Sequence, residues 1–119
     1  MPHRYSFHRD MRLRTSTQFK NVFDRRCSIH GKFISVHGVQ NPDGLVRLGL
    51  AVSRKVSKRA VDRNRVKRLI RESFRHCRNK LSATDFVVVA KPSACAALPI
   101  DVREELDGLW HEVQRRCER

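Results

Sequence analysis

The stretch RNRVKRLIRESFR, residues 63–75, decides how the rest of this chain is expected to fold. Its apolar residues recur at the spacing of one side of an α-helix, and they are Val66, Leu69, Ile70 and Phe74, followed by Cys77. At about 100° per residue the basic residues gather on another side, namely Arg63, Lys67, Arg71 and Arg78, with Asn64, Arg68 and Arg75 beside them. We therefore predict a long amphipathic helix, roughly residues 57–80, with Ser57 as its N-cap.

The basic residues on this side of the predicted helix destabilise it. Like charges four residues apart destabilise a helix by about 0.2–0.5 kcal/mol per pair, and Lys67 stands at this distance from both Arg63 and Arg71. Only Asp62 and Glu72 offset the positive charge. When a sequence repeats an arrangement that destabilises its own helix along one side, those residues are expected to serve a function. Planar guanidinium groups suit paired hydrogen bonds to phosphate.

The charge of the whole chain agrees with this helix. The 119 residues include 26 Lys and Arg against 12 Asp and Glu, a net charge of +14. Residues 54–80 alone hold twelve basic and two acidic residues, which is +10 of that total. A field of one sign favours a nucleic acid as partner over an anionic membrane or a merely solvated surface. No apolar run approaches the roughly 20 residues that span a bilayer, so we expect no membrane contact and a cytoplasmic location.

The remaining segments alternate between helix and strand patterns. We expect a short helix at 17–25 capped by Ser16, strands at 31–40 and 46–53, a strand within 83–92, a loop at 93–98 and a last helix from Pro99 to Cys117. The NPDG turn at 41–44 predicts that the first two strands form an antiparallel hairpin. The apolar run FVVV predicts a strand buried on both faces. The order predicts an α+β two-layer sandwich in a single domain, 1–119, with a basic N-terminal arm at 1–15.

Two apolar features leave alternatives open. Phe19 and Phe23 fall on one side of the short helix with Val22, where they either belong to the core or stack on unpaired bases. In the strand at 46–53 one face is apolar, whereas the other consists mostly of small residues. Such a face allows a helix or a ligand to approach closely, and Arg54 and Lys55 would place charge at its end.

No catalytic or metal-binding pattern is present in the sequence. Hydrolysis of a phosphodiester by a protein usually needs clustered carboxylates or a positioned histidine pair, and the central region offers only Asp62 and Glu72. The four cysteines form no C-x-x-C pair, so we expect packing or surface residues in a reducing compartment. We assign no role to the six histidines. The chain is therefore interpreted as a binding protein rather than a catalyst.

Several motifs together resemble one family. RNRVKRLIRESFR at 63–75 resembles the signature helix of the bacterial ribonuclease P protein subunit. The motifs RLR at 12–14, QFKNVF at 18–23, RLGLAVSRK at 47–55 and DFVVVAKP at 85–92 occupy the places expected for that family, in the same order. The resemblance implies the fold of the second domain of ribosomal protein S5, with element order α-β-β-β-α-β-α, a four-stranded sheet and a left-handed crossover between parallel strands.

The resemblance also implies a function. Members of the family are protein cofactors of a ribozyme that removes the 5′ leader of precursor tRNA. The catalytic RNA performs the hydrolysis and requires magnesium, while the protein binds that RNA and the single-stranded leader. For this chain we expect those two RNA partners, no obligate protein partner, and no cofactor, metal or catalytic residue in the protein. The alternative is a structural RNA-binding protein of ribosomal type.

The resemblance assigns roles to individual residues of this sequence. Those expected to bind RNA are Arg63, Asn64, Arg65, Lys67, Arg68 and Arg71 of the helix, Arg54 and Lys55 before it, and Arg12 and Arg14 of the arm. Those expected to line the leader cleft are Phe19, Phe23, Phe33 and Val36. Many members have an aromatic residue where this chain has Val36, and a Gly-Asn link where it has Ser57, Lys58 and Arg59.

Overall fold

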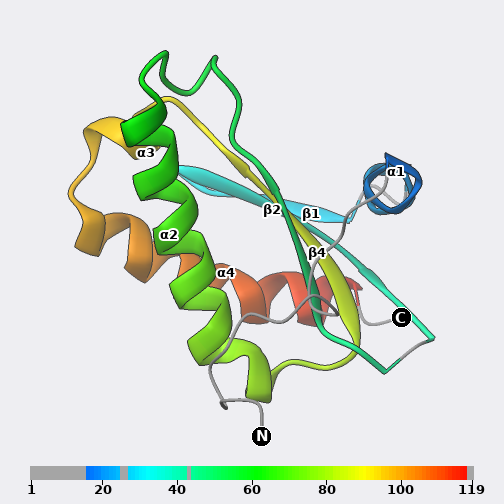
Figure 1. The fold of residues 1–119 in the computed structure, drawn as a ribbon. Coiled ribbons are helices and arrows are strands. Elements are labelled where there is room, and N and C mark those ends of the chain that lie inside the picture. The colour runs from blue at the N-terminus through cyan, green and yellow to red at the C-terminus, as the bar shows by residue number, and fades with distance from the viewer. Residues whose placement is uncertain (1–15, 25–26, 43, 118–119) are drawn as a thin grey trace, which may run out of the picture.

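A computed structural model describes residues 16–24, 27–42 and 44–117 (Figure 1). Its elements are α1 (Ser16–Asp24), β1 (Ser28–His30), β2 (Ile34–Gln40), β3 (Arg47–Ala51), α2 (Ala60–Cys77), the 3₁₀ turn η2 (Arg78–Lys80), β4 (Thr84–Ala90), α3 (Ser93–Ala96) and α4 (Pro99–Cys117). The predicted α+β class is confirmed. The short helix α3 replaces the loop that we expected at 93–98.

The predicted RNA-binding residues Arg12 and Arg14 lie outside the described residues.

The four strands form one mixed sheet in the order β1-β2-β4-β3. β2 runs antiparallel to both β1 and β4, whereas β3 runs parallel to β4. The two strands that flank the NPDG turn are therefore antiparallel in direction but not adjacent, so the predicted hairpin is wrong. β4 lies between them because its apolar side chains need a neighbour on each edge and cover on each face.

Helices α2 and α4 cover one face of the sheet and form the main core with it (Figure 1). At its centre three rings meet edge to face: the Phe86 centroid of β4 lies 6.3 Å from that of Phe74 in α2 and 5.3 Å from that of Trp110 in α4. The Trp110 indole N–H donates to the Ser73 hydroxyl over 2.8 Å. The apolar stripe predicted for α2 is confirmed, since Val66, Ile70 and Phe74 are fully buried. In α4 the fully buried residues are Val102, Leu106, Trp110 and Val113.

Helix α1 packs on the opposite face, which we call the α1 face. Val22 of α1 and Val87 of β4 are both fully buried there. The half-buried side chains of Phe19, Val39 and Val89 pack around them. The prediction that this strand is buried on both faces is therefore confirmed.

Three further observations concern single residues or helices. Cys77 and Cys95 are free, but Cys27 is disulfide-bonded, so the expectation of unpaired cysteines is wrong for Cys27. Gly44, the last residue of the NPDG turn, adopts φ = 78°, which glycine tolerates without strain. None of the helices in the described ranges is long and apolar enough to span a bilayer.

A single carboxylate of α4 fixes the turn between β1 and β2. The Glu105 carboxylate accepts backbone N–H groups from Lys32 at 3.0 Å, Phe33 at 3.0 Å and Ile34 at 2.9 Å. An added Cβ at Gly31 would overlap the same carboxylate, so this position requires glycine. The contact ties the edge of the sheet to α4 across more than 70 residues of sequence.

We predict that Glu105→Gln lowers the free energy of unfolding by about 1.5–3 kcal/mol, the range for hydrogen bonds to a charged group. The amide has only one acceptor oxygen, so it cannot satisfy three donors. Urea denaturation measures the change, with Glu104→Gln, an exposed neighbour that carries the same charge, as control. Equal stability of the two variants would contradict the role of Glu105.

Candidate nucleic-acid interface

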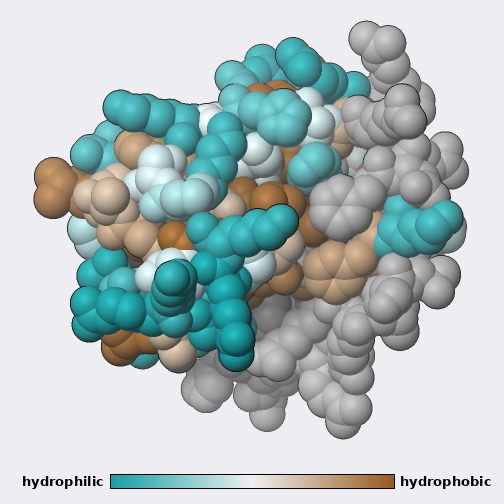
Figure 2. Space-filling view, turned by 90° about the horizontal axis from the view of Figure 1, so that it is seen from above, coloured by the Kyte–Doolittle hydropathy of each residue, from teal (hydrophilic) through white to brown (hydrophobic). Residues whose placement is uncertain are grey.

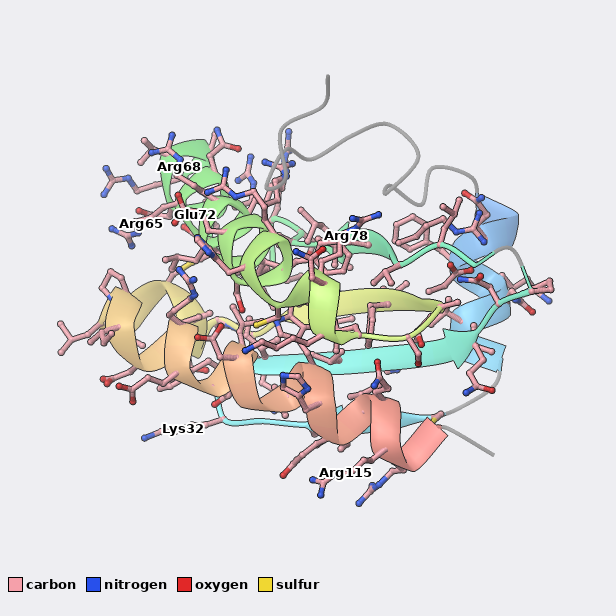
Figure 3. All side chains as sticks on the ribbon, turned by 90° about the horizontal axis from the view of Figure 1, so that it is seen from below. Lys32, Arg65, Arg68, Glu72, Arg78 and Arg115 are labelled. Atoms are coloured by element: carbon pink, nitrogen blue, oxygen red, sulfur yellow. The ribbon has the colours of Figure 1, made fainter. Side chains whose placement is uncertain are left out.

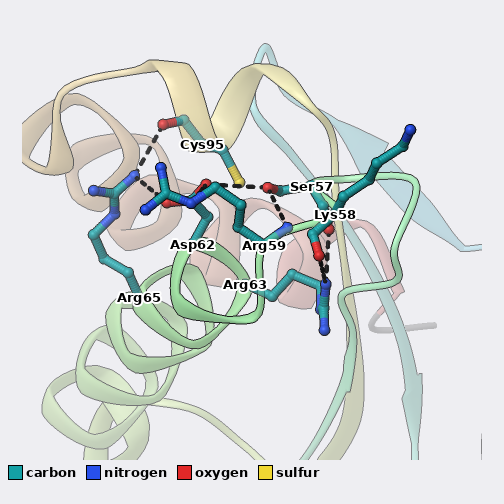
Figure 4. Close-up of polar contacts among 7 residues, drawn as sticks. All are labelled: Ser57, Lys58, Arg59, Asp62, Arg63, Arg65 and Cys95. Carbon is teal, nitrogen blue, oxygen red and sulfur yellow. Dashed lines mark hydrogen bonds and ion pairs between the residues drawn. The ribbon is translucent and has the colours of Figure 1, made fainter.

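The segment that enters α2 is built around Asp62 (Figure 4). The Ser57 hydroxyl donates to Asp62 Oδ2 over 3.1 Å and accepts the backbone N–H of Arg59 at 3.2 Å. The helix begins at Ala60, so the prediction of Ser57 as N-cap is wrong. Asp62 lies in the first turn, where the helix dipole favours a negative charge. The buried side chain of Val56 anchors this segment in the core.

The two arginines of the RNR motif are used within the protein (Figure 4). Arg63 donates from one guanidinium nitrogen to the carbonyl oxygens of Ser57, at 2.9 Å, and Lys58, at 3.0 Å. Arg65 donates to the carbonyl oxygen of Cys95 in α3 at 3.1 Å. Arg63 therefore holds the segment before α2, and Arg65 ties α2 to α3.

The residues between and after these arginines face outward. In the part of the chain that the structure describes, Asn64, Lys67 and Arg68 make no hydrogen bond or ion pair. Asn64 and Arg68 are exposed, and Lys67 is half-buried. A surface hollow on the same helix is lined by Asn64, Arg68, Arg71, Glu72 and Arg75. We call Asn64, Lys67, Arg68, Arg71 and Arg75 the α2 basic face.

The two acidic residues of α2 already have partners within the protein. Glu72 lies 3.9 Å from Arg103 of α4. Asp62 accepts the Ser57 hydroxyl and lies 3.7 Å from Arg65 of the same helix. Arg68 projects from α2, whereas Lys32 and Arg115 lie on the far side of the molecule (Figure 3). Positive charge therefore lies on both sides of the molecule, and the outward side of α2 carries an excess of it because the two acidic residues of the helix are already paired.

The segment before α2 extends this charge. Its residues Arg54, Lys55, Lys58 and Arg59 are all exposed. Figure 2 looks onto this end of the molecule and shows hydrophilic side chains around smaller apolar areas. The structure thus places the predicted Arg54 and Lys55 beside the entry to α2, continuous with the helix rather than at a separate site.

The α1 face has a regular arrangement that follows from the strand register. One row across the sheet contains Ser28, His37, Val87 and Gly49, and the next contains His30, Ser35, Val89 and Ala51. Val87 lies under Val22 of α1, so its row has a histidine on one side and a small residue on the other. Phe19 packs at this face and is only partly buried, which is compatible with both interpretations of this residue.

Two of the expected cleft residues do not lie on this face. Val36 is fully buried in the core beneath α4, so its assignment to the leader cleft is wrong. Phe33 packs partly against the same core, and its ring lies 5.4 Å from the Lys32 ammonium nitrogen. Because side chains alternate along a strand, the neighbour His37 points to the α1 face instead. The side chain of Phe23 lies outside the described residues.

Sequence reasoning missed His30 and His37. Their ring centroids are 6.0 Å apart with the ring planes at 86°, and Ser35 Oγ lies 2.8 Å from His30 Nδ1. Burial, and then the charge of His30, lower the pKa of His37 below its usual value. The signal that could have found the pair is strand alternation, since burial of Ile34 and Val36 sends Ser35 and His37 to the other face.

The carboxylates and imidazoles of the described residues are not gathered into a metal site. No group of three or more His, Cys, Asp and Glu side chains in these ranges is close enough to hold a metal ion. The Asp85 carboxylate, which is nearly buried, is paired with Arg47, whose Nε lies 2.7 Å from Oδ1. What the arrangement can do is bind a polyanion along α2 and an extended segment on the α1 face.

Comparisons with known proteins agree with this geometry. A family model described as Ribonuclease P matches residues 7–114. The ribonuclease P protein component of Aliivibrio salmonicida is 41% identical over 111 residues, which cover 93% of this chain and 95% of that protein. The protein component of Methylococcus capsulatus is 39% identical over 113 residues, covering 95% of this chain and 88% of that protein.

Solved structures show the same similarity. The Staphylococcus aureus RNase P protein superposes with a TM-score of 0.82 at 25% identity, covering 89% of this chain and 97% of that one. The RNase P protein from Thermotoga maritima gives a TM-score of 0.76 at 29% identity, covering 85% of this chain and 96% of that one.

The hydrogen bonds of the RNR motif lead to a prediction about Arg63. We expect Arg63→Ala to lower the free energy of unfolding by about 1 kcal/mol, because it removes two charge-assisted hydrogen bonds at a partly exposed site. It should also speed amide hydrogen exchange in residues 57–59. Arg68→Ala is the matched control and should change stability by less than about 0.5 kcal/mol. If the two variants behave alike, Arg63 does not hold this segment.

Proposed function

Because this chain belongs to the bacterial ribonuclease P protein family, and is thus a component of a tRNA-processing endoribonuclease, we propose a division of its surface between two RNA ligands. The α2 basic face binds the catalytic RNA, and the α1 face binds the single-stranded 5′ leader of precursor tRNA. The protein thereby promotes removal of the leader and maturation of the tRNA 5′ end.

One observation carries the first half of this proposal. Asn64, Lys67 and Arg68 face outward without an intramolecular partner in the described residues. Two cations and an amide that are not used by the fold remain available for phosphate, sugar and base contacts. Like-charge repulsion along α2 is relieved when a polyanion binds, which gives a reason for a helix composition that is unfavourable in isolation.

The second half rests on the character of the α1 face. Phe19 offers an aromatic ring that is only partly buried, and Gly49 and Ala51 leave the second half of β3, after Arg47, without bulky side chains on that face. Unpaired bases bind to proteins by stacking on aromatic rings, each contact contributing about 1–3 kcal/mol. A single-stranded segment with splayed bases fits such a surface better than a duplex does.

Hydrolysis is assigned to the RNA subunit, with the magnesium that it requires. In this proposal the protein contributes by binding and by orienting the precursor. Positioning of a substrate relative to a catalytic centre accounts for part of a rate enhancement without any proton transfer by the protein.

The test is reconstitution with the cognate catalytic RNA. We expect the protein to lower the magnesium concentration needed for cleavage and to tighten binding of precursor tRNA relative to mature tRNA. Equal affinity for precursor and mature tRNA would exclude leader binding. Co-sedimentation with ribosomal subunits, together with no effect on leader cleavage, would instead support a structural protein of ribosomal type.

A charge-matched pair of variants tests the α2 basic face. We predict that Lys67→Ala with Arg68→Ala weakens binding to the catalytic RNA. The slope of log affinity against log salt should fall by about 0.7–0.9 for each phosphate that the variant no longer neutralises. The control is Arg115→Ala with Arg116→Ala, which removes the same charge from exposed positions at the end of α4.

The control separates direct binding from net charge. If both double variants lower the slope equally, net charge alone drives binding, and the α2 basic face is not the contact surface. Urea denaturation of both double variants shows whether folding is intact, and we expect the free energy of unfolding to shift by no more than about 0.5 kcal/mol per substitution.

A further inference from the structure

A histidine pair lies on the α1 face next to the residues proposed to hold the leader. His30 ends β1 and is exposed, and His37 lies in β2 and is half-buried. Their ring centroids are 6.0 Å apart, and the rings meet edge to face. Neither ring belongs to the α2 basic face, so the α1 face has titratable groups of its own.

The strand register holds the pair in place. His37 is opposite Ser28, and His30 is opposite Ser35, so the two histidines are diagonal neighbours on adjacent strands. The Ser35 hydroxyl lies 2.8 Å from His30 Nδ1 and orients that ring. Because both residues lie on paired strands rather than in a loop, their backbone positions are set before any ligand binds.

The other charged groups of this face come from three elements. From β4, Asp85 points to the same face, but Arg47 of β3 pairs with it at 2.7 Å. Asn41 donates to the same carboxylate over 2.8 Å. From α1, Lys20 is exposed. The carboxylate that accompanies the pair on the sheet is therefore already satisfied.

Ligand charge decides the protonation state of such a pair. Burial and the charge of His30 lower the pKa of His37, so the free protein favours its uncharged form near neutral pH. A phosphate group beside the rings acts in the opposite direction, because it stabilises imidazolium. Binding of an anion and uptake of a proton are then linked.

We propose that His30 and His37 determine affinity for the leader by taking up a proton from solvent as leader phosphates dock on the α1 face. This inference rests on the proposed function. In the complex the pKa of the His37 imidazole is higher than in the free protein. The added affinity is therefore fully present below the free-protein pKa and is lost as pH rises through the pKa of the complex.

The experiment measures binding to the holoenzyme over a range of pH. Dissociation constants for mature tRNA, and for precursor tRNA blocked chemically at the scissile position, are compared from about pH 8 to about pH 5.5, where histidine titrates. We define discrimination as the dissociation constant for mature tRNA divided by that for precursor tRNA. We expect this ratio to rise as pH falls, by up to about tenfold per pH unit for one proton taken up. Mature tRNA, which lacks the leader, removes pH effects common to both ligands.

Three variants locate the linkage. His30→Gln and His37→Gln should flatten the pH dependence, so that the ratio of the two constants no longer rises as pH falls. His37→Phe keeps a planar ring that does not titrate, so the ratio of the two constants should be independent of pH in this variant as well. His111→Gln, at an exposed position of α4, is the matched control and should keep the wild-type slope.

Three other results would contradict the inference or the proposed function. Discrimination that does not change with pH in the wild-type protein would overturn the histidine inference and leave leader binding intact. Absence of discrimination at every pH would overturn the proposed function and the inference with it. A wild-type slope in both glutamine variants would also overturn the inference. His30→Gln alters an exposed ring, so the test stands even if His37→Gln fails to fold.

Discussion

The structure depends on the burial of β4 on both of its faces. Phe86 and Val88 lie in the core formed with α2 and α4, while Val87 lies under α1. A strand that is apolar on both sides is unstable at the edge of a sheet or facing water. β2 and β3 must therefore flank it, although both precede it in sequence, and the remaining elements follow from that placement.

This central strand gives the protein two surfaces of different character. Val66, Ile70 and Phe74 hold one side of α2 against the main core, so the charged side can only face outward. The opposite face of the sheet is covered by α1 along part of its width and contributes small residues and histidines. One core thus keeps a strongly cationic helix apart from a sheet surface of small residues and histidines, which is the separation that the proposed binding of two RNA ligands needs.

Local patterns predicted local structure and failed for pairing. The apolar stripe of α2 and the two-sided burial of β4 are properties of each segment's own residues, and both predictions are confirmed. The NPDG turn correctly predicts that the strands beside it run antiparallel. No residue between 31 and 53 indicates that β4, more than 30 residues later, lies between them, so their adjacency could not be predicted.

The entry to α2 shows a second limit of local patterns. Ser57 has the residue type of an N-cap, yet its hydroxyl bonds to Asp62, and the helix begins at Ala60. Arg63 then binds the carbonyl groups that precede the helix. An N-cap is defined by its position in the backbone at the start of the helix. Here that position depends on contacts between side chains, which cannot be inferred from the type of one residue.

Family resemblance transfers positions in a sequence, but not the direction of side chains. A displacement of one residue along β2 exchanges the faces of the sheet, which is why Val36 lies in the core while its neighbour His37 lies on the α1 face. The same distinction applies to the RNR motif, in which Arg63 and Arg65 bind carbonyl groups of this protein and Asn64 faces outward.

The net charge of +14 therefore overstates the number of cations that are available to RNA. The salt dependence of binding should report the smaller number, because only counterions displaced from phosphates at the contact surface contribute to it.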